Sequence, residues 1–380
     1  MSICWNVLYK SVLIGIVSIP ILTVYAFSIL SQAKHLEPEI NITHNNTFVT
    51  LAFVGDIMAH SPIIRSSYDT NHKSYDFSPI FSHIQSDLQS YDFLIGNLET
   101  PVAGIERGFS GYPNFNAPTE MLSTLSQSGF DILAFANNHS MDQGLQGITH
   151  TVQEIKKHTM LPIGATNTTS EYYTPTIVYK NGIRIAFINA SYGLNGYTLS
   201  EKNTYRINII NTKKLISAIQ NARELSADIV IVYLHFGNEY EKTANKQQVQ
   251  LAHTLANAGV DAIIGSHPHV VQNVEYYAVG KKIVPILYSL GNFLSNQQDI
   301  HTDIGMIYKL RIYKDTTQMQ DAQDYIVTSK KIEKNSYKYK LDFWSTLLSK
   351  TDVKNISDRY KLYKSRYIPK DFRSINSLSN

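Results

Sequence analysis

Short apolar runs recur along this chain, and each ends in polar residues of the kinds that bind metal ions or transfer protons. A short apolar run bounded by turn residues is typical of a buried strand. The six runs, each with the polar residues that follow it, are Phe48–Val54 (Asp56), Tyr91–Gly96 (Asn97 and Glu99), Asp131–Ala136 (Asn138 and His139), Ala227–Leu234 (His235), Asp261–Gly265 (His267 and His269) and Ile283–Leu290 (Asn292). In an α/β sheet, ligands are held just beyond the carboxyl ends of the strands. The repetition therefore predicts one site assembled from several distant strand ends.

Segments with helical spacing lie between these strands, so strand and helix alternate along the chain. The four clearest helical segments are Thr119–Ser128, Ile148–His158, Thr212–Leu225 and Asn245–Ala258. This alternation predicts an α/β domain. Four more strands are predicted at Pro175–Val178, Arg184–Ala190, Gly305–Ile312 and Tyr325–Ile332, and they suggest a second sheet packed on the first. Residues 341–380 have a mostly helical and irregular pattern.

The most informative strand end is Gly265-Ser266-His267-Pro268-His269. Positions i and i+2 of an extended segment point the same way, so His267 and His269 face one pocket while Pro268 stiffens the link. Two imidazoles placed in this way can reach adjacent metal ions. The alternative for an isolated His-x-His is a surface loop that happens to carry two histidines, and the other strand ends argue against it.

Six of the polar residues together form a donor set for a transition metal. They are Asp56, Glu99, Asn138, His235, His267 and His269. Two carboxylates, one amide oxygen and three imidazoles suit Mn, Fe or Zn better than Ca, because imidazole favours transition metals. The single cysteine, Cys4, excludes an intramolecular disulfide and a Cys-based zinc site.

Two divalent ions in such a site can support phosphoryl chemistry. Ions about 3.5–4 Å apart that share a carboxylate stabilise both sides of an in-line displacement by water. His139, beside Asn138, is placed to give a proton to the leaving oxygen. Taken singly, each residue also has a structural explanation, because loop histidines are usually only hydrogen-bonded and an asparagine after a strand usually caps a turn. Their joint occurrence at strand ends favours the metal site.

Six motifs of this chain resemble, in order and approximate spacing, those of the poly-gamma-glutamate capsule synthesis protein (CapA) family, a branch of the calcineurin-like metallophosphoesterases. They are Gly55-Asp56-Ile57-Met58, Asn97-Leu98-Glu99, Asn137-Asn138-His139 with Asp142 and Gly144, His235-Phe236-Gly237-Asn238-Glu239-Tyr240, Gly265-Ser266-His267-Pro268-His269 and Ser289-Leu290-Gly291-Asn292-Phe293. The resemblance covers roughly Phe48–Ile312. It implies a four-layer α/β/β/α sandwich. It also implies a bacterial surface protein with an amino-terminal anchor, acting with a membrane-bound ligase that makes or exports an anionic polyglutamate capsule.

The resemblance implies a role for each matching residue. The implied metal ligands are Asp56 and His269 for the first ion, Asn138, His235 and His267 for the second ion, and Glu99 as the bridge between them. The implied proton donor is His139. The residues expected near the substrate pocket are Asn97, Glu239 and Asn292.

This sequence departs from the metallophosphoesterase pattern at Met58. Typical members have a histidine two residues after the first aspartate, so the first-metal site has one ligand fewer here. His60 lies four residues after Asp56 and is not assigned in its place. Phe236 stands where the family often has tryptophan, which is a minor change on an aromatic wall.

Residues 11–30 (SVLIGIVSIPILTVYAFSIL) are an uncharged apolar segment with Lys10 before it and Lys34 after it. A segment of this length spans a bilayer core, and Pro20 is tolerated within such a helix. A removable signal peptide is the alternative, because Ser31-Gln32-Ala33 resembles a small-x-small cleavage site, but the apolar run exceeds the ~7–15 residues of a usual signal core. The segment predicts a single-pass anchor in the cytoplasmic membrane, with the rest of the chain outside.

The predicted organisation has four parts. They are a membrane anchor or signal peptide at 1–33, a polar tether at 34–47, the CapA-like metallophosphatase domain at 48–312 and a basic strand and helix extension at 313–380.

Positive charge is concentrated at the carboxyl end. The net charge of the chain is +3, yet residues 330–380 contain 13 Lys and Arg against 5 Asp and Glu. Such a segment is usually a solvated face. The alternative prediction is that Lys330–Arg373, with its interleaved tyrosines, contacts a polyanion such as lipid phosphate or a polyglutamate chain. The tyrosines are Tyr337, Tyr339, Tyr360, Tyr363 and Tyr367. Nucleic acid is not an expected partner of an external domain.

Three functions agree with these patterns, and whether the chain is an enzyme stays open at this point. The first is an anchored component of poly-gamma-glutamate capsule biosynthesis or export with a metallophosphatase-like site. The second is an extracytoplasmic metal-dependent phosphoesterase unrelated to a capsule. The third is a catalytically silent scaffold, which Met58 favours over the second, whereas His139 beside Asn138 favours some chemistry.

Overall fold

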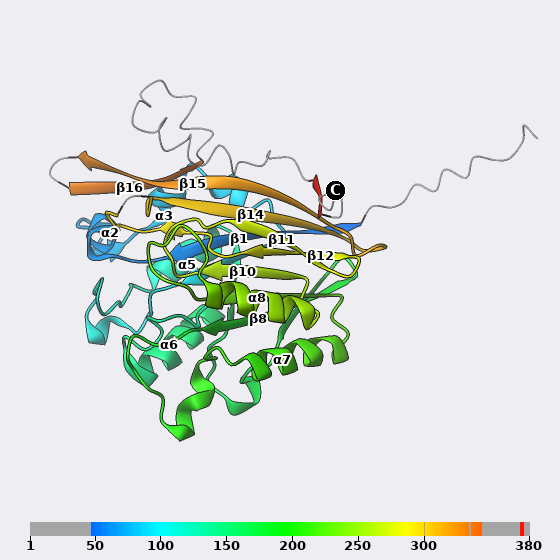
Figure 1. Cartoon of the computed structure of the whole chain (residues 1–380). Helices are drawn as coiled ribbons and strands as arrows, with labels where there is room; N and C mark the ends of the chain where they lie inside the picture. The colour runs from blue at the N-terminus through cyan, green and yellow to red at the C-terminus, as the bar shows by residue number, and fades with distance from the viewer. Residues whose placement is uncertain (1–46, 300, 334–335, 344–372, 376–380) are drawn as a thin grey trace, which may run out of the picture. The chain divides into compact units, whose positions relative to one another are not determined.

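Residues 47–299, 301–333, 336–343 and 373–375 are described by the structure, a computed structural model (Figure 1). All of them belong to one unit, Thr47–Asn380. The predicted anchor at 1–33, and the tether up to residue 46, lie outside the described residues. Within the described residues, no helix is both long and apolar enough to cross a membrane.

A nine-stranded sheet contains the first three predicted strands. Its strands in spatial order are β16 (Ser336–Phe343), β15 (Met319–Glu333), β14 (Ile304–Tyr313), β1 (Phe48–Ile57), β4 (Phe93–Leu98), β5 (Phe130–Ala134) and β6 (Leu161–Ile163), with β13 (Asn292–Leu294) paired to β1 and β17 (Arg373–Ser374) paired to β15. Strands β1, β4, β5 and β6 are parallel. Their carboxyl ends therefore lie at one edge of the sheet, where Asp56, Glu99 and Asn138 are found.

A six-stranded sheet contains the other predicted strands that carry histidines. Its order is β11 (Val274–Val279), β12 (Lys282–Leu287), β10 (Ala262–Ser266), β9 (Ile229–His235), β8 (Ile183–Ser191) and β7 (Thr176–Lys180). The four central strands are parallel, and the edge strands β11 and β7 run antiparallel to their neighbours. The carboxyl ends of β9 and β10 place His235, His267 and His269 at one edge of this sheet.

The four predicted helices all form, with ends within a few residues of the predicted ones. They are α5 (Glu120–Gln127), α6 (Gly144–Lys157), α7 (Thr212–Glu224) and α8 (Lys246–Asn257). Helix α8 begins with a capping box, in which Asn245 accepts the Gln248 backbone N–H and Gln248 accepts that of Asn245. The shorter elements are α2 (Ser61–Ser66), α3 (Ser78–Phe81), α4 (Gln85–Leu88), the hairpin of β2 (Tyr68–Asp69) and β3 (Ser74–Tyr75), and the 3-10 turns η1 (Ile105–Arg107), η2 (Thr169–Glu171) and η3 (Glu201–Arg206).

Three apolar clusters separate the layers of the domain. One joins the nine-stranded sheet to helices α2 to α6 through side chains such as Leu94, Leu122 and Ile148. A second fills the space between the two sheets, and a third joins the six-stranded sheet to α7 and α8. Figure 1 shows α7 and α8 on the side of the sheets away from β14, β15 and β16. The predicted mixed α/β fold with several sheets is confirmed, and it is consistent with a metallophosphoesterase-like sandwich.

The second sheet differs from the predicted one in its strands. Of the four additional predicted strands, two belong to the six-stranded sheet: most of Pro175–Val178 lies in β7, and Arg184–Ala190 lies in β8. Segments Gly305–Ile312 and Tyr325–Ile332 instead extend the nine-stranded sheet, because β14 pairs antiparallel with β1 and β15 pairs with β14. Apolar alternation predicts that a strand exists, but it does not specify which sheet the strand joins. Residues 341–343 belong to strand β16, although the pattern of residues 341–380 is mostly helical and irregular.

A close backbone approach positions the first carboxylate. A Cβ atom on Gly55 would lie 1.7 Å from the Gly291 carbonyl oxygen, so only glycine fits at this position. The next residue, Asp56, donates its backbone N–H to the same oxygen (3.0 Å). This contact places Asp56 opposite Asn292 in the short parallel pairing of β1 and β13.

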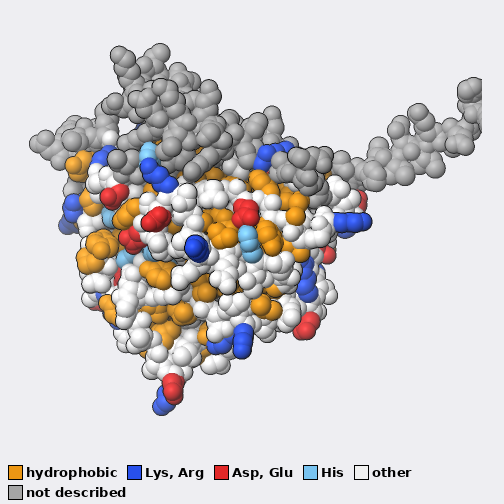
Figure 2. All heavy atoms as spheres, viewed as in Figure 1, with side chains coloured by type: hydrophobic (Ala, Val, Ile, Leu, Met, Phe, Trp, Pro, Cys, Tyr) orange, Lys and Arg blue, Asp and Glu red, His pale blue; other side chains and the backbone are white. Residues whose placement is uncertain are grey.

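The surface of the described residues carries mixed charge. On the face shown in Figure 2, acidic and basic side chains are scattered among hydrophobic and uncharged ones, and no extended patch of one sign is visible.

Candidate metal centre

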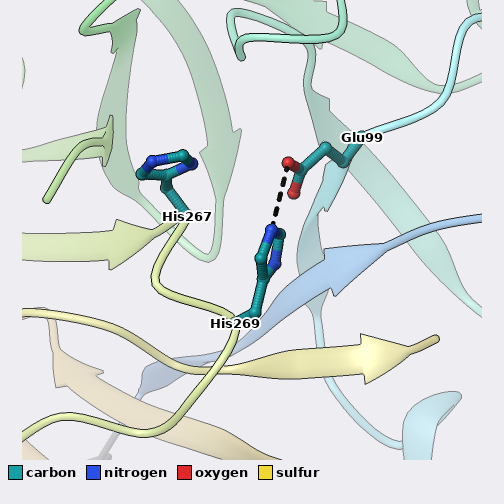
Figure 3. Close-up of side chains that lie close together, drawn as sticks. All are labelled: Glu99, His267 and His269. Carbon is teal, nitrogen blue, oxygen red and sulfur yellow. Dashed lines mark ion pairs between the residues drawn. The ribbon is translucent and has the colours of Figure 1, made fainter. Parts of the chain in front are cut away.

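The polar residues that follow the parallel strands meet in one buried cluster. Asp56 lies in β1, Glu99 follows β4, His235 ends β9, and His267 and His269 follow β10. Each of these residues is at most 3% exposed. In Figure 3, Glu99, His267 and His269 surround a common space, and both histidines leave the same loop. The strand ends of both sheets therefore supply a single site.

Asn97 lies between the two carboxylates. Its Nδ2 donates to Asp56 Oδ1 (2.8 Å) and to Glu99 Oε2 (3.1 Å), and Asn97 is fully buried. Its own carbonyl oxygen accepts an N–H of Asn137 (3.2 Å). The resemblance implied a place for Asn97 near the substrate pocket, and in the structure Asn97 lies among the ligand candidates, where it orients both carboxylates.

Two oxygen acceptors lie within hydrogen-bond distance of the same ring nitrogen of His269. Its Nδ1 is 3.0 Å from Asp56 Oδ2 and 3.1 Å from Asn292 Oδ1. A proton on Nδ1 satisfies both oxygens and leaves Nε2 as the basic nitrogen, which lies 3.9 Å from Glu99 Oε1 (Figure 3). Asn292, the second predicted pocket residue, is buried and its amide donates to Gln297 and Thr302, so it also acts by orienting another side chain.

His235 makes contacts on both ring nitrogens. Its Nδ1 lies 3.0 Å from Ser266 Oγ, and its Nε2 lies 2.8 Å from Asn138 Oδ1. The same Nε2 is 3.5 Å from Glu99 Oε1. The predicted ligand Asn138 is thus next to His235 and within the cluster, with its oxygen directed at the imidazole.

Two buried atoms in the cluster, Glu99 Oε1 and His267 Nδ1, have no hydrogen-bond partner among the residues that the structure describes. Leaving a buried polar group unpaired costs about 1–3 kcal/mol, and more for a charged group. Two donor sets have ligand atoms within 4.8 Å of one another: Glu99, His267 and His269, and Asp56, Glu99 and His235. The residues therefore fit a divalent metal, and both sets include Glu99, the predicted bridge. The predicted division of ligands between two ions stays a prediction.

The backbone around the two loop histidines is in a conformation that L-residues rarely adopt. His267 has φ 99° and His269 has φ 59°. Such conformations persist when surrounding contacts enforce them, and they cluster at functional sites. Here the His267 backbone N–H is 3.3 Å from Asp56 Oδ2, which links the loop to the tip of β1.

Burial and neighbouring groups shift the pKa values within the cluster. Burial, reinforced by the Asp56 carboxylate, raises the pKa of Glu99 well above its usual range. Burial, together with the neighbouring histidines, lowers the pKa of His267 to about 3 and the pKa of His235 well below its ordinary value. Both imidazoles are therefore neutral near pH 7, and neutral imidazole is the form that binds metal ions.

The metal-free protein is expected to lose stability as the pH falls from 7 to 5. Burial first, and nearby histidines second, lower the pKa of His267 to about 3 and that of His60 to about 4. In the unfolded chain these groups take up protons near their ordinary pKa of 6.5, so below that pH the unfolded state binds more protons and the free energy of unfolding falls. For the buried His267 the loss at pH 5 approaches about 2 kcal/mol. Urea unfolding in the presence of a chelator at pH 7, 6 and 5 measures this loss of unfolding free energy.

Glu99 opposes this trend, because its raised pKa lets the folded state bind a proton that the unfolded state has released above pH 4.5. The one proton that Glu99 binds in the folded state offsets the proton uptake of at most one histidine in the unfolded state. We expect His267→Gln to flatten the pH dependence by about one proton, and His72→Gln, at a side chain that is 80% exposed, to leave it nearly unchanged. If the free energy of unfolding of His267→Gln depends on pH as steeply as that of the wild type, the fold does not lower the pKa of this imidazole.

His139 lies beside the cluster and pairs with Asp142. Its Nδ1 is 2.8 Å from Asp142 Oδ2, and that oxygen also accepts the Phe115 backbone N–H (2.8 Å). The Phe115 ring packs edge-on against the imidazole, with centroids 4.8 Å apart. A carboxylate on Nδ1 fixes the tautomer and the ring orientation, so Nε2 is left to exchange a proton. His139 belongs to neither donor set, and its role as proton donor stays a prediction.

The structure adds a loop that sequence analysis did not assign to the site. Asn195 accepts an N–H of Asn138 (3.0 Å), and its own Nδ2 lies 3.4 Å from His139 Nδ1. Tyr192 packs on His267 with ring centroids 4.5 Å apart. The signal was present in the sequence, because Tyr192 follows the predicted strand Arg184–Ala190 in the same way that the other site residues follow theirs.

The remaining predicted residues lie at the edges of the cluster. Glu239 is exposed, and its charge is one of those that raise the pKa of Glu99 after burial and Asp56. Met58 is buried and 1% exposed. His60 Nδ1 lies 3.3 Å from the Asn296 backbone nitrogen, and its ring packs edge-on against Phe115.

Comparison with known proteins agrees with the resemblance found in the motifs. Residues 50–297 match the family described as bacterial capsule synthesis protein PGA_cap. The chain is 29% identical over 330 residues to the PGA biosynthesis protein CapA of Bacillus subtilis (strain 168), covering 85% of this chain and 84% of that protein. It is 29% identical over 323 residues to the capsule biosynthesis protein CapA of Bacillus anthracis, covering 82% and 73%. Among solved structures, NAD nucleotidase (NadN) of Haemophilus influenzae is similar over 84% of this chain and 68% of that chain, with a TM-score of 0.46 and 10% identity.

Proposed function

This chain belongs to the PGA_cap family of bacterial capsule synthesis proteins, and we propose that it acts in capsule biosynthesis through a divalent-metal centre that hydrolyses a phosphate ester. The names of its two Bacillus relatives place those proteins in the biosynthesis of PGA and of a capsule, which supports the same process for this chain. The metallophosphoesterase-like α/β/β/α sandwich implied by the motifs supports the reaction class.

The buried Glu99 carboxylate is the observation that carries the proposal. Its Oε1 has no hydrogen-bond partner within the described part of the chain, and it lies 3.5 Å from His235 Nε2 and 3.9 Å from His269 Nε2. An ionised carboxylate in this position is unfavourable without a counter-charge. A cation between the carboxylate and the imidazoles would satisfy all three groups. Two ions sharing Glu99, of Mn, Fe or Zn, suit these ligands best.

Each remaining residue has a separate task in this proposal. A divalent metal, when bound, supplies Lewis acidity toward a phosphoryl oxygen. Asn97 fixes the two carboxylates, and Asn292 fixes His269 with Nε2 facing the ligand space. His139 gives a proton from Nε2 to the leaving oxygen, and Asp142 keeps that nitrogen in the correct tautomer.

Metal content and hydrolysis by a chain of residues 47–380 test the proposal. We expect close to two transition-metal ions per chain and hydrolysis of a phosphodiester or a phosphomonoester, lost on chelation and restored by metal. A protein that stays metal-free after incubation with Mn, Fe and Zn, and hydrolyses neither ester, would have no metal centre.

Met58 favours a second candidate, a catalytically silent scaffold of the same fold. Its thioether is buried where typical metallophosphoesterases have an imidazole ligand, and thioethers are poor ligands for Mn. The measurement of metal content separates this candidate from the enzyme.

A phosphoesterase outside capsule biosynthesis is the remaining alternative, and it predicts normal capsule in a deletion strain.

We propose in addition that residues 11–30 anchor the chain in the cytoplasmic membrane, with the catalytic domain outside and membrane-bound ligase or export subunits as partners. The uncharged segment of bilayer-spanning length supports this. The basic segment 330–373 would contact anionic polymer or lipid, as its charge supports. The full chain should remain in membranes after an alkaline carbonate wash, whereas a chain starting at residue 47 should not. Release of the full chain by the wash would exclude an anchor.

A further inference from the structure

The loop after β8 places one exposed side chain against two predicted site residues. Asn195 Oδ1 accepts an N–H of Asn138 (3.0 Å), and Asn195 Nδ2 lies 3.4 Å from His139 Nδ1 and 3.5 Å from its Nε2. Asn138 and His139 are only 1% and 4% exposed, whereas Asn195 is exposed. A residue at the surface therefore contacts both the predicted metal ligand and the predicted proton donor.

Local contacts hold this loop in a defined turn. Ser191 Oγ donates to the Gly193 carbonyl oxygen (2.8 Å), and the Tyr197 backbone N–H donates to the Leu194 carbonyl oxygen (2.9 Å). Leu194 is buried in the apolar cluster between the nine-stranded sheet and its helices. Asn195 has φ 48°, a left-handed conformation that asparagine adopts more readily than most residues. The turn therefore keeps the Asn195 backbone beside Asn138.

The side-chain amide of Asn138 has two chemically different ends. Its oxygen, Oδ1, is able to bind a cation and lies 2.8 Å from His235 Nε2. Its nitrogen, Nδ2, carries two hydrogens and no free acceptor site, and this is the end that donates to Asn195. A half-turn of the amide would direct these N–H groups at the ligand space. The acceptor on Asn195 therefore favours the orientation in which Oδ1 faces that space.

His139 and Asp142 oppose a half-turn of both amides together. If Asn195 and Asn138 both rotated, their mutual hydrogen bond would survive with donor and acceptor exchanged. Asn195 would then place its oxygen beside the His139 imidazole, whose Nδ1 proton is already directed at Asp142 Oδ2 (2.8 Å). Because that oxygen would gain no donor from Nδ1, the observed pair of orientations is favoured.

We propose that Asn195 is a positioning residue, which holds the Asn138 oxygen toward a bound metal ion through the hydrogen bond to Asn138 Nδ2. The inference rests on the proposed function, because this orientation matters for binding only if Asn138 is a metal ligand. Partners that orient metal ligands typically change metal affinity by about 10- to 100-fold. Asn195 should therefore affect the ion that Asn138 binds and leave the other ion unchanged.

Titration of the metal-free full chain in detergent with Co²⁺, followed by the visible absorption of the bound ion, tests this role. We expect the wild type to bind two ions. Asn195→Gly should bind one of them about 10- to 100-fold more weakly and the other within about threefold of the wild type. Glycine removes the side chain and still adopts the left-handed backbone. Asn195→Asp keeps an oxygen that accepts from Asn138, so it should bind both ions at least as tightly as the wild type.

Asn181→Gly is the matched control. Asn181 is also an exposed asparagine with a left-handed backbone (φ 52°), and it precedes β8, whereas Asn195 follows that strand. Its Nδ2 donates to the carbonyl oxygen of Phe48 at the start of β1, whereas Asp56 lies near the end of β1. With a chelator present, both glycine variants should lower the melting temperature to a similar extent. Only Asn195→Gly should lose metal affinity.

Three results would overturn the role of Asn195 while the metal centre stands. They are wild-type affinity of Asn195→Gly for both ions, equal weakening of both ions in that variant, and equal losses in Asn195→Gly and Asn195→Asp. The second result would indicate a general disturbance of the site, and the third would show that the acceptor oxygen is not the cause. If the wild type binds no Co²⁺, the metal centre of the proposed function fails and this inference fails with it.

Discussion

Glu99→Gln is expected to lower metal affinity by more than about 100-fold, because it removes the ligand shared by both donor sets. The same change should leave the metal-free fold as stable as the wild type, or more stable. Burial and Asp56 raise the pKa of Glu99, so the carboxylate is unfavourable in the empty site. Glutamine keeps the shape and the acceptor for the Asn97 amide without the charge. A residue retained only for folding would not show this opposite pair of effects.

Two measurements on the same sample separate these effects. Metal per chain is measured after dialysis against a defined free-metal concentration, and thermal unfolding is measured with a chelator present. Glu106→Gln, at an exposed position in η1, is the matched control and should change neither value. Stoichiometric metal in Glu99→Gln, or a metal-free melting temperature several degrees below the wild type, would assign Glu99 to the fold instead of a metal.

The strand ends could be predicted because their information is local. An apolar run followed by Asp56, by Glu99 or by His235 needs no knowledge of the rest of the chain, and parallel strands bring such residues to one edge. The helices α5 to α8 were predictable for the same reason, since their apolar spacing is a property of one segment. These features gave the fold class and the residues that the structure brings together.

The parts that could not be predicted depend on contacts between distant segments. Asn97 and Asn292 were expected near the substrate pocket because they belong to the family-like motifs, and the structure shows their side chains bonded to the carboxylates and to His269. The loop with Tyr192 and Asn195 follows a predicted strand but contributes no carboxylate or imidazole, so its contacts with His267, Asn138 and His139 became evident only in the structure. Strands β14 and β15 join the first sheet through pairing with β1, which apolar alternation does not encode.

His139→Ala is expected to lower kcat by about 10²–10⁴-fold while metal content stays at the wild-type level. His139 lies in neither donor set, so its removal should not release metal. Asp142→Asn should cause a smaller loss, because an amide oxygen in the place of Oδ2 can still accept from Nδ1 and from the Phe115 backbone N–H, but it has no charge with which to stabilise a protonated His139.

The leaving group distinguishes a proton donor from a side chain that only shapes the site. An alkyl phosphate ester needs a proton on its departing oxygen, whereas 4-nitrophenolate leaves without one. His139→Ala should therefore reduce hydrolysis of the alkyl ester far more than that of the 4-nitrophenyl ester. Equal losses on both esters would indicate disturbed geometry, and loss of metal would make His139 a ligand. If the alkyl ester alone is affected and Asp142→Asn shows the same selectivity, the pair functions as an oriented general acid.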